Sequence, residues 1–208
     1  MIALSNEKRP RKARARKFYI VGPNVRLGKG GWEMENLPAL LMGPRILAPT
    51  PGQRGFPNVP EMPYLVFDKR TGRDPRDVEQ FHDYWLVSDR IKTVLARLDP
   101  DGVAFVKCHS SCKHGGPAPT YWLCDVLRLL EAVDEEKSRL TIKGDSQGHK
   151  WYSFVGGASL VIREDVVASA HIFRLSFSLS NIVCDQELKD ACKDAGLKGI
   201  TFDDAADF

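Results

Sequence analysis

The order of the expected elements predicts an α+β fold, with a mostly antiparallel sheet and a few amphipathic helices. Short runs of β-branched and aromatic residues recur along the chain, and a few segments carry helical signals instead. The two kinds of element do not alternate regularly, as they would in a parallel β–α–β fold. The 208 residues, of which 43% are hydrophobic, are enough for one core. We therefore expect residues 18–208 to form a single domain.

The first strands are expected where short apolar runs meet turn-forming residues. Residues 18–21, 64–67 and 103–106 are runs of this kind, rich in β-branched and aromatic side chains. Residues 43–63 contain six prolines, which lack the amide hydrogen that a helix needs. This segment is expected to be a long loop, and residues 69–76 a polar connection rich in turns.

Two helices are expected in the middle of the chain. Ser88 is a suitable N-cap for a helix over residues 89–98. Its apolar positions recur at helical spacing, at Ile91, Val94, Leu95 and Leu98. Residues 121–133 are mostly apolar, and we expect a second helix there with a broad buried face.

The C-terminal third is expected to be mainly β structure. Residues 139–143 and 151–155 flank a glycine-rich turn and predict a hairpin, and residues 158–163 predict a further strand. Residues 171–183 alternate with a period of two, which predicts one half-buried strand. One face would carry Phe173, Leu175, Phe177, Leu179 and Val183, and the other Arg174, Ser176, Ser178 and Ser180.

The chain is expected to end with a helix and an edge strand. Asp185 is a good N-cap for a helix over residues 186–195, and Gly196 is a good residue to end it. Residues 200–202 would then close the sheet as an edge strand.

Charge is distributed unevenly along the chain. Seven of the 30 basic residues lie within residues 8–17, so the remainder has 23 basic and 27 acidic residues and a net charge of −4. We expect residues 1–17 to form a basic, flexible arm. Such an arm can bind nucleic acid through its phosphates, but charge runs are more often solvated tails. A nucleic-acid partner is therefore the alternative and not the main expectation.

Several features favour a cytoplasmic protein. No apolar run reaches the roughly 18 residues that a membrane helix needs, and the first residues do not resemble a secretory signal. The five cysteines are an odd number without the spacing of a disulfide framework, which favours a reducing compartment. No membrane partner is expected, and the sequence does not specify an oligomeric state.

One segment, KCHSSCKHGG at residues 107–116, concentrates potential metal ligands. Zinc would be held by Cys108, Cys112, His114 and Cys124, because thiolates and imidazoles are its usual ligands. The spacing lacks the second ligand pair of a structural zinc site, so the other interpretation is a polar loop. A cysteine nucleophile is disfavoured because adjacent His109 would point to the opposite face of a strand. Because the spacing of the zinc ligands is incomplete, we expect no cofactor.

Two further motifs do not predict catalysis. Residues 144–148 match G-x-S-x-G, but a strand-like segment follows them where a nucleophile elbow needs a helix. Residues 28–31 are rich in glycine but lack the ending of a phosphate-binding loop. We interpret both as turns or loops, and we predict no catalytic residues.

Two blocks resemble a known family. They are YWLVSDR with the following helix and DPDGV at residues 84–103, and HIFRLSFSLSNIVCDQELKDACKDAGLKGITF at residues 171–202. Together with Tyr121-Trp122-Leu123 they are similar to immunity proteins of bacterial polymorphic toxin systems, over about residues 18–204. The segment at 108–118 and the basic arm fall outside the family's pattern.

The resemblance implies a protein that binds and neutralises a cognate toxin, without chemistry of its own. Aromatic and charged side chains in loop-like segments are the expected partner contacts, because such side chains carry most binding energy. They are Trp32, Phe56, His109, Lys113 and His114. For Trp32 and Phe56 the other interpretation is local packing of the long proline-rich loop. The alternatives are a nucleic-acid-binding or regulatory module that uses the basic arm, and a zinc-dependent enzyme that uses the Cys/His loop at 108–124.

Overall fold

The structure is a computed structural model that describes residues 15–28, 30–41, 54–56 and 61–208. The basic residues at 8–14 and most of the proline-rich segment lie outside the described residues. The strands are β1 (Phe18–Pro23), β2 (Trp32–Met34), β3 (Tyr64–Phe67), β4 (Val78–Phe81), β5 (Tyr84–Ser88), β6 (Val103–Lys107), β7 (His109–Cys112), β8 (Tyr121–Val126), β9 (Leu129–Leu130), β10 (Thr141–Gly144), β11 (Lys150–Ser153), β12 (Ile172–Leu175), β13 (Ser178–Asp185) and β14 (Ile200–Asp204). The helices are α1 (Leu37–Leu41), α2 (Asp89–Leu98), α3 (Glu164–Val167) and α4 (Gln186–Asp194), with short 3₁₀ turns η1 (Val25–Leu27) and η2 (Pro100–Gly102).

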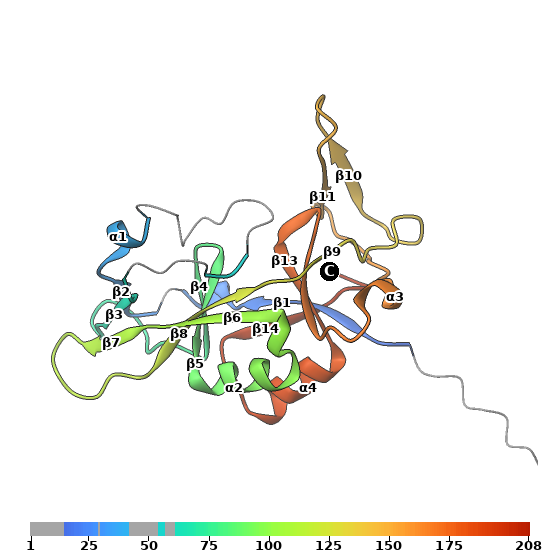
Figure 1. Cartoon of the computed structure of the whole chain (residues 1–208). Helices are drawn as coiled ribbons and strands as arrows, with labels where there is room; N and C mark the ends of the chain where they lie inside the picture. Colours follow the sequence, from blue (N-terminus) through green and yellow to red (C-terminus); the bar gives the residue numbers. More distant parts are fainter. Residues whose placement is uncertain (1–14, 29, 42–53, 57–60) are drawn as a thin grey trace, which may run out of the picture.

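Two larger sheets form the body of the molecule (Figure 1). One has the order β14-β1-β13-β12-β9 and the other the order β4-β5-β8-β6. A smaller sheet, β2-β3-β7, and the hairpin β10-β11 complete the β structure. Neighbouring strands are antiparallel except for two pairs, β9 with β12 and β3 with β7. The predicted α+β class with mostly antiparallel sheets is therefore confirmed.

Three apolar clusters cover both faces of the two larger sheets. The first lies between them and the helices α2 and α4, and it includes Trp85, Ile91 and Leu188. The second packs the small sheet against the other face of β5 and β8, around Tyr84 and Leu123. The third covers the other face of the five-stranded sheet, between β12, α3 and the base of the hairpin.

The prediction of a helix at residues 121–133 is wrong. The segment forms β8, which lies between β5 and β6, and then the short strand β9. Leu123 belongs to the second apolar cluster, whereas Cys124 and Val126 belong to the first. A central strand with two buried faces is apolar at nearly every position, so its period of two is hidden in the sequence.

Two further strand predictions are corrected. Residues 171–183 form a hairpin of β12 and β13 instead of one strand, and the register shifts between Arg174 and Leu175. Arg174 is consequently buried and Leu179 is exposed, the reverse of the expectation. Residues 158–163 contribute only isolated bridges, through Ser159 and Ile162, and not a strand.

The other predicted elements are present, whereas β2, β4, β5, β7, β9, α1 and α3 were not predicted. The first strand, the strands at 64–67 and 103–106, the hairpin and the edge strand β14 are present. The N-cap of α2 differs in detail, because the Ser88 hydroxyl donates to Asp77 Oδ1 at 2.7 Å and makes no cap hydrogen bond. The end of α4 matches a Schellman motif: the amide of Gly196, with φ +61°, donates to Lys193 and that of Leu197 to Cys192.

A buried charge network links the two larger sheets. Asp125 in β8 is fully buried and accepts hydrogen bonds from Arg54, from the Gly55 amide at 2.7 Å, and from Arg174 Nη2 at 3.2 Å. Arg174 in β12 also donates to the Val126 carbonyl at 3.0 Å. Burial lowers the pKa of Arg174, and the adjacent Arg54 acts in the same direction. The network therefore holds charge in the interior only through its mutual contacts.

Candidate functional site

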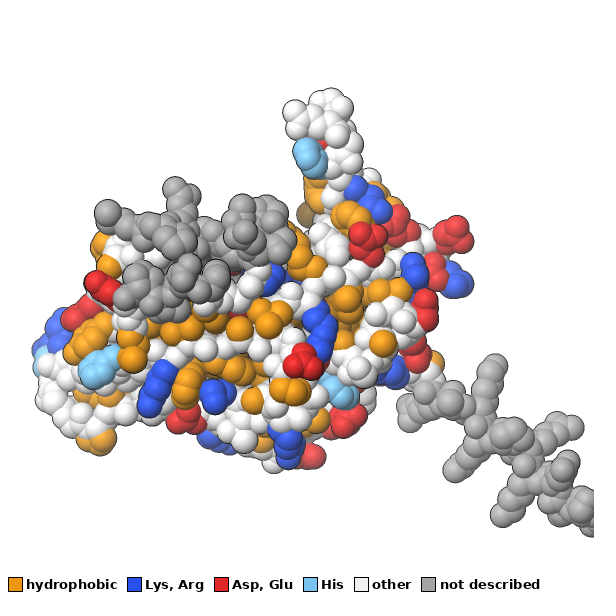
Figure 2. All heavy atoms as spheres, in the orientation of Figure 1, with side chains coloured by type: hydrophobic (Ala, Val, Ile, Leu, Met, Phe, Trp, Pro, Cys, Tyr) orange, Lys and Arg blue, Asp and Glu red, His pale blue; other side chains and the backbone are white. Residues whose placement is uncertain are grey.

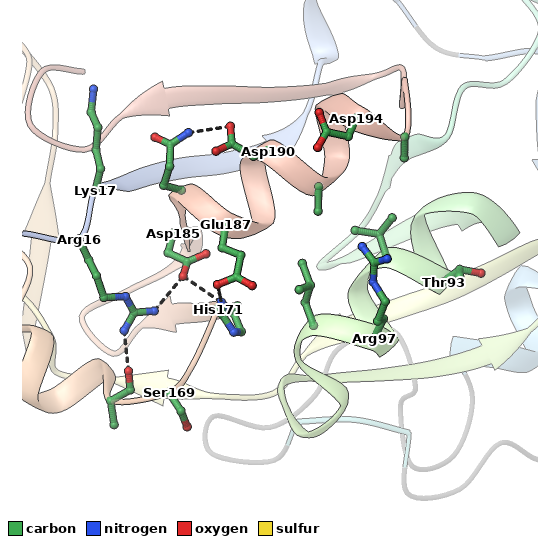
Figure 3. Close-up of a pocket in the computed structure, with 16 residues that line it drawn as sticks. Arg16, Lys17, Thr93, Arg97, Ser169, His171, Asp185, Glu187, Asp190 and Asp194 are labelled. Atoms are coloured by element: carbon green, nitrogen blue, oxygen red, sulfur yellow. Dashed lines mark hydrogen bonds and ion pairs between the residues drawn. The ribbon is translucent and has the colours of Figure 1, made fainter. Parts of the chain in front are cut away.

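An open groove runs between α2 and α4, with a volume of about 1120 Å³ (Figure 3). Its floor is largely apolar, with Val94, Leu98 and Ala191 among its lining residues. Thr93 and Arg97 of α2 lie on one side, and Asp190 and Asp194 of α4 on the other.

Asp185 organises one end of this groove. Its Oδ1 accepts the Leu188 amide at 3.0 Å and so caps α4, as the sequence predicts. Its Oδ2 accepts from Arg16 Nη2 at 2.9 Å and lies 2.9 Å from His171 Nδ1. Arg16 also donates to the carbonyl of Ala168 at 2.5 Å. The last residues of the predicted basic arm are thus bound to the body.

His171, Asp185 and Glu187 are the one group of potential metal ligands that the described residues bring together, with ligand atoms within 4.8 Å of one another. Both Asp185 oxygens already accept hydrogen bonds, and the guanidinium of Arg16 supplies a positive charge on Oδ2. These contacts satisfy the carboxylate without a cation. The arrangement therefore fits a structural link between the N-terminus, β12 and α4 better than a metal site.

The same groove does not contain an assembled nucleophilic site. Ser169 lines it beside His171 (Figure 3), but no hydrogen bond joins the two side chains in the described part of the chain. A serine nucleophile needs a base within hydrogen-bonding reach. The His171–Asp185 pair alone orients an imidazole and holds α4 in place.

The four zinc candidates are not brought together. Cys108 is buried in the second apolar cluster, and Cys124 in the first. Burial raises the pKa of Cys108 to about 12, and it also raises the pKa of Cys124. Cys112 and His114 line a separate cavity of about 370 Å³ with Phe67 and Tyr121. The two buried thiols keep their protons, which disfavours metal binding.

The residues predicted to contact a partner have different environments. Trp32 is only 3% exposed and packs in the second apolar cluster, so it is not an exposed aromatic and the alternative of local packing holds at this position. Phe56 packs on Tyr84 with ring centroids 5.1 Å apart. His109, Lys113 and His114 are exposed at the end of the molecule that carries β7.

Asp68 lies beneath that exposed group. It lies 3.5 Å from Lys113 Nζ and 3.6 Å from His114 Nε2. The Arg70 amide donates to Asp68, and this hydrogen bond contributes most to lowering the pKa of the carboxyl group. Lys113 and His114 therefore share one carboxylate and leave hydrogen-bonding capacity for a partner.

The hairpin β10–β11 is predicted by the sequence, but its exposed hydrophobic side chains are not. Ile142 and Trp151 are each more than 40% exposed, and Val155 beside the hairpin is 88% exposed. Their exposure could not be foreseen, because alternation in a two-stranded segment does not reveal which face lacks a covering element.

Comparison with known proteins decides the family. The sequence model of the immunity protein family Imm11 matches residues 17–207, which is most of the chain. The chain belongs to the Imm11 immunity protein family. A search among curated proteins gave no match. The start of the Imm11 match coincides with Lys17, whose ammonium binds Asp204 Oδ2 at 2.6 Å in β14. No helix of the described residues is long and apolar enough to cross a membrane.

Proposed function

We propose that this Imm11 protein binds a cognate bacterial toxin and neutralises it by occupying a surface that the toxin needs. The observation that carries the proposal is the match of the immunity family to residues 17–207. Toxin immunity through binding needs a preorganised, complementary surface and no chemistry of its own. The satisfied His171–Asp185–Arg16 contacts and the dispersed cysteines are consistent with a binding protein.

The cytoplasm is the compartment that we propose for this activity. All five cysteines are free, and four of them are buried. Free thiols persist in a reducing compartment. His109, Lys113 and His114 remain proposed partner contacts because all three are exposed, and Lys113 and His114 also lie close to one carboxylate.

Co-expression tests the proposal directly. The open reading frame next to this gene is cloned as the candidate toxin and expressed from an inducible promoter, with and without the Imm11 chain. We expect growth to be restored by the chain, and the two proteins to co-elute as one complex in gel filtration. An unrelated immunity protein expressed at the same level is the control. Growth arrest in the presence of the folded chain, with no complex, would refute the function.

A further inference from the structure

The hairpin β10–β11 projects from the body of the molecule (Figures 1 and 2). All four residues of β10 are exposed, and the two strands form a sheet of their own. A hairpin that no other sheet extends must be held by contacts at its base to keep its shape. The base of this hairpin makes contacts of that kind with Glu135 and Phe177.

Glu135 and Phe177 provide that anchorage. Tyr152 is buried, packs edge-on against Phe177 with centroids 5.4 Å apart, and donates from its hydroxyl to Glu135 at 2.5 Å. Lys150 Nζ binds the same carboxylate at 2.7 Å and lies 4.0 Å from the centre of the Phe177 ring. The projecting strands are therefore preorganised, which lowers the entropic cost of binding.

The outer edge of β10 offers backbone hydrogen bonds. Ile142 is the register partner of Tyr152, whose amide donates away from β10, to the Phe177 carbonyl at 2.8 Å. In an antiparallel pair, directly opposed residues exchange both hydrogen bonds or neither. The amide and carbonyl of Ile142 consequently point away from β11, toward the open edge. An edge of this kind accepts an extended segment of another chain as a further strand.

The side chains around this edge are of the kind that bind proteins. The exposed large hydrophobic side chains of the described residues are few, and Ile142, Trp151, Val155 and Leu179 are among them. Of these, Ile142 and Trp151 lie on the hairpin and Val155 directly after it. Exposed aromatic and aliphatic side chains on a rigid element are typical binding hot spots.

Charge specifies the partner further. Lys143 is the register partner of Trp151, so both side chains lie on one face of the hairpin and Ile142 lies on the other. Lys143 is exposed and forms no ion pair within the described part of the chain. A carboxylate beside it on an added strand would complete a cross-strand pair of opposite charges.

We propose that the toxin docks on this hairpin by adding an extended segment to the edge of β10. The segment places an apolar side chain beside Ile142 on one face and a carboxylate beside Lys143 on the other, with Trp151 flanking the contact. This inference rests on the proposed function and names the surface that performs it. The partner is thus an extended, alternating apolar and acidic strand of the toxin.

Proline scanning of the edge provides the test. In Ile142→Pro the amide that faces the open edge is lost, while the hydrogen bonds between β10 and β11 remain, since proline is tolerated at such edge positions. Ile142→Thr keeps the amide and a β-branched side chain. It therefore separates the contribution of the backbone hydrogen bond from that of the apolar side chain. Lys143→Glu reverses the charge, and Val25→Ala removes an exposed hydrophobic side chain far from the hairpin in sequence as a control. Far-UV circular dichroism and urea unfolding verify that each variant folds.

The affinity of each purified variant for the candidate toxin of the co-expression test is measured by titration calorimetry. We expect Ile142→Pro and Lys143→Glu each to weaken binding about tenfold or more, Ile142→Thr less, and Val25→Ala hardly at all. Wild-type binding that every folded hairpin variant retains would overturn the docking surface and leave the immunity function standing. Absence of wild-type binding and protection would overturn both. Dimerisation of the chain itself that Ile142→Pro abolishes would assign the edge to a second copy and overturn the toxin as its occupant.

Discussion

Arg174 in β12 donates to Asp125 in β8 at 3.2 Å, although the two side chains are only 4% and 0% exposed. The contact crosses from the five-stranded sheet to the four-stranded sheet. The only other guanidinium on Asp125 among the described residues is that of the partly buried Arg54, so a single carboxylate is paired with two cations. This side chain therefore adds a charged contact to the apolar cluster that lies between the two sheets.

We expect Asp125→Ala to lower the free energy of unfolding by about 3–5 kcal/mol, because it leaves buried guanidinium groups without a counter-charge. Urea denaturation followed by circular dichroism measures the loss. The double variant Asp125→Ala/Arg174→Met should be more stable than Asp125→Ala alone. Asp101→Ala, at an exposed aspartate, is the control and should change stability by less than about 0.5 kcal/mol. Equal stability of the Asp125 and Asp101 variants would contradict the structural role.

Asp185 combines a helix cap with the contacts of Arg16 and His171. We expect Asp185→Ala to cost about 2–3 kcal/mol, of which the lost cap accounts for about 1 kcal/mol and the orphaned polar groups for the rest. Asp185→Asn keeps an acceptor for the Leu188 amide and should lose less. Urea unfolding midpoints of the two variants give the comparison. A loss of stability as large in Asp185→Asn as in Asp185→Ala would exclude the cap contribution.

Gly199 and Gly148 have nearly the same positive φ, +84° and +83°. A Cβ on Gly199 would lie 2.7 Å from both Arg76 Cβ and the Val78 carbonyl oxygen, whereas a Cβ on Gly148 would meet nothing within 4 Å. Each alanine substitution costs about 1–2 kcal/mol for the left-handed backbone. We expect Gly199→Ala to cost at least about 1 kcal/mol more, from the steric clash. Thermal or urea unfolding of the pair isolates that contribution.

Glu135 makes the anchorage of the hairpin sensitive to acid. Its hydrogen bonds from Lys150 and then Tyr152 lower its pKa below the ordinary glutamate value of 4.5. Because the pKa is lower in the folded state, the stabilisation is complete above the ordinary pKa of the unfolded chain. It is lost as the pH falls through the folded-state pKa. We expect Glu135→Gln to reduce the difference in urea midpoint between pH 6 and pH 3. Glu136→Gln, at the exposed neighbour, is the control and should retain the wild-type difference.

The sequence predicted elements well where one face is buried or a turn is marked. The amphipathic spacing of α2, the Asp185 cap and the glycine-rich turn of the hairpin are local signals, and all three are present. The sequence of β8 predicts a helix because the strand is covered on both sides, so its apolar residues show no period of two. The turn between β12 and β13 escaped notice because residues 176–177 are serine and phenylalanine, without glycine or proline.

The candidate binding surface was predictable only in part. The Cys/His segment attracted attention by composition, yet tertiary packing separates Cys108 from Cys124 and buries both. Trp32 lies in a segment with the composition of a loop, but it packs on Phe81 of β4 and is buried in the second apolar cluster. Conversely, the importance of Ile142 and Trp151 depends on what does not pack against them, and a sequence does not contain that information.

The burial of four of the five thiols leaves one cysteine that can be labelled selectively in the native sequence. Cys108, Cys124, Cys184 and Cys192 are buried, and burial raises the pKa of each of them. Cys112 is the remaining thiol and is partly exposed at the end of β7. A maleimide fluorophore should therefore attach at this one position without any mutation. Its emission during a toxin titration would report from the β7 end of the protein, so that a change there and a loss of affinity in hairpin variants can be followed in a single cuvette.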